Sequence, residues 1–115
     1  MDRNALLAAM DIVASEKPTP VTIEAWGQTV YVKALTAVEF EENTADADDP
    51  KSKNKAARAA CRVLCDESGQ RLFDPSNEAD VQRLARQPWA LLRRILAATE
   101  FQDKPRNGKG AASGN

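Results

Sequence analysis

The residues that could do chemistry in this 115-residue chain are few, and histidine is not among them. Without histidine the chain lacks the usual general base at neutral pH and the commonest metal ligand. Cys61 and Cys65 are four positions apart, which on a helix would place both thiols on one face. A zinc ion would need two further soft ligands, and helical geometry together with a reducing compartment disfavours a disulfide. We therefore interpret both cysteines as small thiols that face the core.

One acidic cluster has the composition of a calcium site, namely Asp46, Asp48 and Asp49. A calcium-binding EF-hand loop needs glycine at its sixth position and glutamate at its twelfth. Counted from Asp46, those positions hold Lys51 and Ala57, so the interpretation fails. The chain also has no glycine-rich loop that could hold a phosphate group. The sequence thus predicts no metal site, no cofactor and no catalytic residue, and we expect a protein that is not an enzyme.

Basic residues gather toward the C-terminal end, at Arg83, Arg86, Arg93, Arg94, Lys104, Arg106 and Lys109. Acidic residues dominate the first 49 positions, although the net charge is only −1. Such asymmetry can orient weak self-association or attract an acidic partner, and it also fits two solvated faces. Nucleic-acid binding by the basic helices is the alternative function. Against it stand the balanced overall charge and a single aromatic residue, Trp89, among the basic side chains.

These residues need a scaffold, and its first part is a β-hairpin. Apolar side chains alternate with polar ones over residues 21–25 and again over 30–33, which is typical of half-buried strands. Between them lies a Trp26-Gly27-Gln28 turn, where Gly27 permits a tight backbone conformation. Trp26 at the tip is the aromatic residue that we expect to be exposed for a partner.

A helix should follow the hairpin directly. Thr36 and Glu39 have the spacing of a capping box, and Leu35 precedes them. Helical spacing predicts four further helices, over residues 2–14, about 55–64, from 75–77 to 87, and from 88 onward. Residues 43–55 contain few apolar side chains and are predicted to be a mobile loop. The expected fold class is therefore α+β, mainly helical, with about five helices and one hairpin.

A single small domain is expected over residues 1–102, followed by a disordered tail over 103–115. The apolar segments are too short to cross a membrane, and residues 2–14 lack the features of a signal peptide. We therefore expect a cytoplasmic protein with no membrane partner.

In their order along residues 20–101, these features resemble the tail assembly chaperones of long-tailed bacteriophages, in their short form. The shared elements are Trp26-Gly27, Tyr31-Val32-Lys33, Leu35-Thr36-Ala37 with Glu39, the turn from Asp66 to Phe73, and a helical segment spaced Val81, Leu84, Pro88, Leu91 and Ile95. Gly69 and Phe73 in the turn, like Gly27, Thr36 and Glu39, are expected to have structural roles, and Phe73 should anchor the turn to the domain.

The resemblance implies a non-catalytic protein that binds the tape-measure protein and helps tail-tube (major tail) subunits to assemble around it. It also implies a location in the cytoplasm of the bacterial host and absence from the mature virion. The residues that we expect at partner contacts are Trp26, Arg86, Trp89, Arg93 and Arg94. Many members of this family are also made in a longer form by a −1 ribosomal frameshift. Gly108-Lys109 is a candidate site for such a shift, or simply a common dipeptide in a flexible tail.

Overall fold

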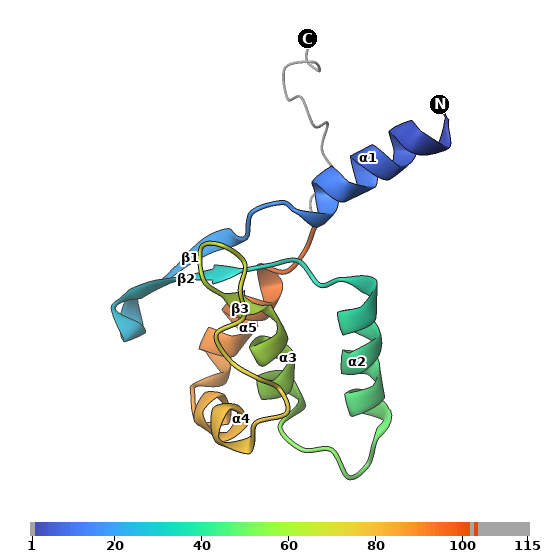
Figure 1. Ribbon diagram of the computed structural model, residues 1–115. Coiled ribbons are helices and arrows are strands. Elements are labelled where there is room, and N and C mark those ends of the chain that lie inside the picture. Colours follow the sequence, from blue (N-terminus) through green and yellow to red (C-terminus); the bar gives the residue numbers. More distant parts are fainter. Residues whose placement is uncertain (1, 102, 104–115) are drawn as a thin grey trace.

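The computed structural model describes residues 2–101 and 103, and it confirms the α+β class (Figure 1). A three-stranded antiparallel sheet in the order β1-β2-β3 lies against α3, α4 and α5. The elements are α1 (Arg3–Ala14), β1 (Thr19–Ile23), β2 (Gln28–Val32), α2 (Ala37–Asp48), α3 (Lys55–Val63), β3 (Leu64–Cys65), α4 (Glu78–Ala85) and α5 (Trp89–Ala97). The candidate frameshift position Gly108-Lys109 and all of the predicted tail except Asp103 lie outside the described residues.

The predicted hairpin is present, with Ile23 of β1 opposite Gln28 of β2. Its turn is longer than the sequence pattern indicated, because a 3₁₀ turn occupies Glu24–Trp26 and ends at Gly27 with φ +63°. Ala25, predicted to extend the first strand, therefore lies in the turn. Gly27 has the left-handed conformation that an L-residue adopts only with strain, as its expected structural role requires.

The third strand was not predicted. The helix that contains Cys61 ends at Val63, and the backbone then becomes extended. Leu64 and Cys65 pair with Val32 and Tyr31 of β2. Cys65 consequently lies in a strand, not on the helical face that its spacing from Cys61 suggested. Both cysteines are buried free thiols, as expected.

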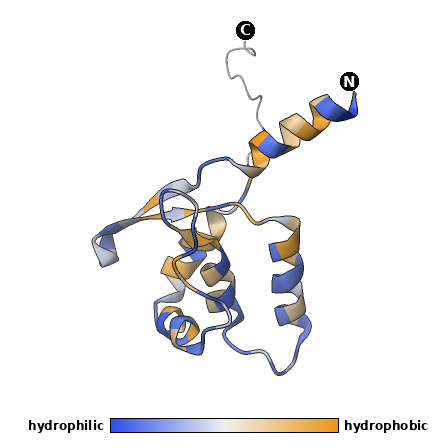
Figure 2. Ribbon diagram, viewed as in Figure 1, coloured by the Kyte–Doolittle hydropathy of each residue, from blue (hydrophilic) through white to orange (hydrophobic). Residues whose placement is uncertain are grey.

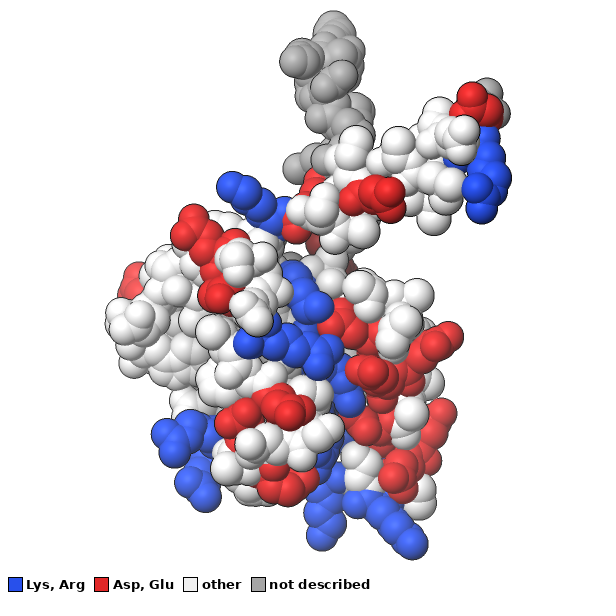
Figure 3. All heavy atoms as spheres, in the orientation of Figure 1, with Lys and Arg blue, Asp and Glu red and all other residues white. Residues whose placement is uncertain are grey.

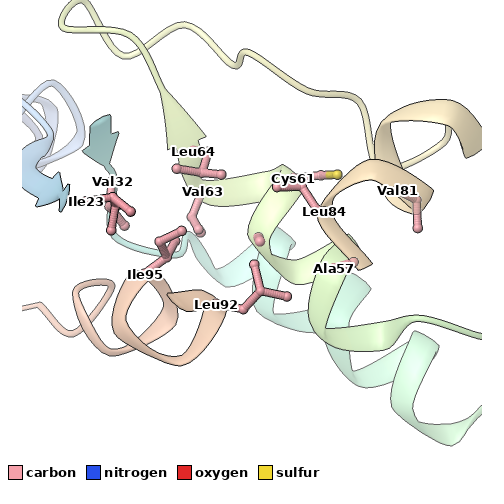
Figure 4. Packing of buried hydrophobic residues seen from close by; sticks show 11 residues of the cluster. Ile23, Val32, Ala57, Cys61, Val63, Leu64, Val81, Leu84, Leu92 and Ile95 are labelled. Carbon is pink, nitrogen blue, oxygen red and sulfur yellow. The ribbon is translucent and has the colours of Figure 1, made fainter. Parts of the chain in front are cut away.

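The core lies between one face of the sheet and the three C-terminal helices (Figure 4). Ile23 and Val32 of the sheet meet Ile95 of α5 at one end of the core. At the other end α3 packs against α4 and α5 through small side chains, which let helix axes approach closely. The fully buried set includes Ile23, Val32, Ala60, Cys61, Val63, Cys65, Val81 and Ile95.

The first helix extends away from this core (Figure 1). Its start matches the sequence prediction, because the Asp2 side chain accepts a hydrogen bond from the Ala5 N–H at 2.8 Å. Every residue of α1 is nevertheless exposed, including 56% of Met10 and 50% of Ile12. Figure 2 shows hydrophobic residues along most of the length of this projecting helix.

The second helix is longer than predicted. Its capping box at Thr36 and Glu39 is confirmed, but the helix continues to Asp48, so the predicted loop over 43–55 is wrong for residues 43–48. Only residues 49–54 connect α2 to α3, and Asn54 ends the connection in a left-handed conformation with φ +60°. After Phe40 the only apolar residues of α2 are Ala45 and Ala47, and its second half is held by polar contacts with Arg62.

The turn after β3 has the expected chemistry. Asp66 accepts hydrogen bonds from the Ser68 hydroxyl and from the backbone N–H groups of Gln70 and Ser68, and these bonds lower the pKa of its carboxyl group. Gly69 provides the positive φ, +92°, that closes the turn. Phe73 then packs, half-buried, against the core, and its role as an anchor of the turn stays a prediction.

Candidate partner-binding surfaces

Trp26 is not the exposed tip residue that we expected. Its ring is half-buried against the core, and its Nε1 donates a hydrogen bond to Gln87 Oε1 at 2.9 Å. The 3₁₀ turn folds the end of the hairpin back toward the junction of α4 and α5, which brings these two residues together. Trp26 therefore attaches the hairpin to the helices.

Trp89 is the exposed tryptophan. It is the first residue of α5, with Pro88 at the N-cap position, and 58% of its surface is exposed. Arg93 lies one helical turn further on the same side of α5 and is also exposed. Arg86 precedes this helix. The guanidinium of Arg94 donates a hydrogen bond to the backbone carbonyl of Thr22 in β1 at 2.8 Å. The structure thus places Trp89 and Arg93 on one side of α5, leaves Arg86 exposed at the end of α4, and gives Arg94 a contact with the hairpin.

A shallow hollow of about 240 Å³ lies beside Trp89. Five of its eight lining residues are apolar, including three alanines, and the other three are polar or charged. The lining residues are Asn54, Lys55, Ala56, Ala57, Ala85, Gln87, Trp89 and Leu92. The sequence analysis missed this feature, because the alanines come from two helices that only the fold brings together.

Glu39 is a buried carboxylate that joins three segments. It forms ion pairs with Lys33, at the end of β2, at 2.7 Å and with Arg71, after β3, at 2.8 Å. It also accepts a hydrogen bond from the Thr36 N–H at 3.0 Å as part of the capping box. Burial alone would raise the pKa of this carboxyl group, but the bonds from Lys33, Thr36 and Arg71 lower it to about 2. The group is therefore a charged structural centre at neutral pH.

A second polar cluster surrounds Arg62 of α3, which is buried. Its guanidinium contacts three side chains of α2, namely Glu42 at 3.1 Å, Asp46 at 2.9 Å and Asn43. Together with Glu39 these residues form a polar stripe on the inner face of α2, at spacings of three and four. Figure 3 shows the acidic side chains of α2 beside basic side chains of the neighbouring segments.

The inner face of α2 is polar and its large apolar side chains are exposed, the reverse of the usual arrangement in an amphipathic helix. Of the residues of α2, all of which the structure describes, only Glu39 is buried, while 63% of Val38 and 62% of Phe40 are exposed. Amphipathic helices normally bury an apolar stripe. Here charge pairing holds the helix in place and its large apolar side chains remain on the outside.

The buried thiols do not form a reactive site. Burial raises the pKa of Cys61 to about 11, and burial also raises the pKa of Cys65, so both are protonated at neutral pH. Within residues 2–101 and 103, no group of three or more metal-ligating side chains could hold an ion. Over the same residues, no helix is long and apolar enough to span a membrane.

Comparison of the chain with protein-family models, with curated proteins and with solved structures finds no match.

Proposed function

We propose that this protein is a tail assembly chaperone of a long-tailed bacteriophage. In this role it binds the tape-measure protein in the host cytoplasm and promotes assembly of the tail-tube protein around it, without catalysis. The ordered resemblance along residues 20–101 motivates the proposal. Its physical support is α1, a helix in which nine of twelve residues are apolar and all are exposed.

Such a helix suits a client that is itself helical and apolar. A helix that is hydrophobic around most of its circumference is normally covered by other elements. The only charged residues of α1 are Arg3 and Asp11, so most of its surface is available for apolar contact. A short helix offers little area, and repeated weak contacts along an extended client would supply avidity. These properties match what the resemblance implies for a protein that keeps tape-measure helices in solution.

The proposal predicts a tape-measure gene beside this one, and co-expression of the two proteins tests it. The wild-type chain should increase the soluble fraction of the client and co-purify with it. The double variant Leu6→Asp, Met10→Asp should lose most of this effect, because both side chains are exposed on α1 and their replacement leaves the core intact. Val38→Asp is the matched control, since it removes an equally exposed apolar side chain from α2.

Failure of the wild-type chain to bind or solubilise the client would contradict the proposal. Retarded migration of duplex DNA at physiological salt would favour the alternative, nucleic-acid binding through Arg86 and Arg93. Phosphate contacts by arginines weaken steeply with added salt, so the measurement must be made at that salt concentration.

A further inference from the structure

We propose that in the absence of a client the α1 helix of one copy docks into the hollow beside Trp89 of a second copy. The proposal goes beyond the chaperone function and does not depend on it. It starts from two surfaces, namely the exposed apolar side chains of α1 and the shallow hollow beside the exposed Trp89, which is lined by both apolar and polar residues. The two surfaces have complementary shapes, because α1 is a projecting helix and the second surface is a shallow hollow.

The two surfaces do not meet within one chain in this structure, since no residue of α1 lines the hollow. Four residues, 15–18, connect α1 to β1, and a fully extended segment of that length spans about 14 Å at most. Figure 1 shows α1 leaving the sheet on one side of the molecule, whereas the hollow lies at the starts of α3 and α5 on the other. A second copy can supply the missing helix without any rearrangement of the fold.

The side chains fit this contact. Leu6, Met10 and Val13 follow one another at spacings of four and three, so they form one row along α1. All three are exposed by at least 40%. A row of large side chains can pack against a hollow partly lined by small alanines, and the exposed Trp89 beside them is of the residue type most often found at binding hot spots.

Charge supports the same pairing. Lys55 lines the hollow, Arg86 lies between two of its lining residues, and Arg93 is one turn from Trp89. At the apolar surface of α1 the acidic residues Asp2 and Asp11 outnumber the single basic residue, Arg3. An apolar centre with oppositely charged rims is the arrangement that orients two protein surfaces. The contact should therefore weaken as salt concentration rises.

Sedimentation velocity over a wide concentration range tests the proposal in the full-length, client-free protein. The wild type should associate reversibly, and the arm variant Met10→Asp and the hollow variant Trp89→Ala should each weaken association at least tenfold. Both side chains are more than half exposed, so melting temperatures should stay near that of the wild type. Val38→Asp is the control and should associate like the wild type.

A mixture of the two defective variants gives the sharper result. An intact α1 on one variant and an intact hollow on the other can still form one contact, so mixing should restore heterodimers. A wild type that remains monomeric at every concentration would overturn the proposal. So would association that persists in Trp89→Ala, because α1 would then pair with α1 or with a different surface.

Cross-linking identifies the contact directly. Met10→Cys in one tagged copy and Ala85→Cys in another should be joined by a short bismaleimide, while Val38→Cys should not react with Ala85→Cys. The native cysteines are buried and protonated, so they contribute little background. Exclusive joining of two Met10→Cys copies would overturn the proposed pairing. If the protein is monomeric but still solubilises its client, only this inference fails and the chaperone function stands.

Discussion

Arg62 of α3 lies 2.9 Å from a buried carboxylate oxygen of Asp46 in α2, and this pair marks where the two helices meet. That oxygen accepts no hydrogen bond from the described part of the chain, so the guanidinium is its electrostatic partner. Charged groups removed from water without a partner are costly, and the arrangement therefore requires both helices to be in place.

Replacing Arg62 should loosen α2 selectively. Arg62→Met keeps most of the side-chain volume but leaves the acidic stripe uncompensated, and we expect a loss of about 2–3 kcal/mol, since two of the partner side chains are partly solvated. Amide hydrogen exchange should accelerate in α2 far more than in α3. Arg93→Met, at an exposed position of α5, is the control. Uniform exchange across both helices would show that α2 is held by other contacts.

The ion pairs of Glu39 should make stability fall in acid. The carboxyl pKa is about 2 in the folded protein and near 4.5 in an unfolded chain. Protonation therefore favours the unfolded state, so the stabilisation is complete above pH 4.5 and disappears as the pH falls to about 2. After allowance for solvent near Lys33 and Arg71, we expect about 2 kcal/mol.

Urea unfolding of wild type and Glu39→Gln measures this effect. The two proteins should differ at pH 7 and converge as the pH approaches 2. Glu41→Gln, at an exposed position on the same helix, should follow the wild type throughout. A difference between wild type and Glu39→Gln that does not change with pH would contradict the assignment.

Phe73→Ala should destabilise the protein by about 2–3 kcal/mol, less than the loss expected for a fully buried phenylalanine, because the ring is only half-buried. Its neighbour Leu72 is 53% exposed, and Leu72→Ala should cost much less. Thermal unfolding of both variants gives the comparison. Equal melting temperatures would show that Phe73 does not anchor the turn.

Trp26→Phe should cost about 1 kcal/mol, since it keeps an aromatic ring but removes the donor to Gln87. Gln87→Leu should leave the indole N–H without its acceptor at a half-buried position, at a similar cost. The double variant should lose less than the sum of the two, because both changes remove one interaction. Strict additivity in denaturant unfolding would mean that the hydrogen bond contributes nothing.

Local patterns predicted the elements whose determinants are adjacent in sequence. The hairpin alternation, the capping box at Thr36 and the turn at Asp66 all appear where expected. The second half of α2 was missed because its fixed partner, Arg62, is some twenty positions away. The two-residue strand β3 was missed because its pairing with β2 is long-range.

The candidate surfaces were harder to predict. The sequence favoured Trp26 over Trp89 as the exposed contact residue, and only the fold shows that Trp26 bonds to Gln87 while Trp89 is exposed. The apolar spacing of residues 5–13 correctly predicted a helix but could not show that its surface is left uncovered. Hollows formed by alanines from separate helices give no local signal at all.

The polar stripe of α2 does not by itself fix the position of the helix along its axis relative to Arg62. A shift of the helix by three residues would bring Glu42 to the position of Glu39 and Asp46 to that of Asn43, so acidic groups would still face Arg62. Electrostatic attraction is long-ranged and tolerates such shifts, unlike interlocking apolar side chains. The alignment must come from the start of the helix, where the capping box between Thr36 and Glu39 fixes the first turn and Glu39 pairs with Lys33, the residue after β2. Thr36 thus fixes the residue at which α2 begins, and the ion pairs stabilise the packing of the helix against its neighbours.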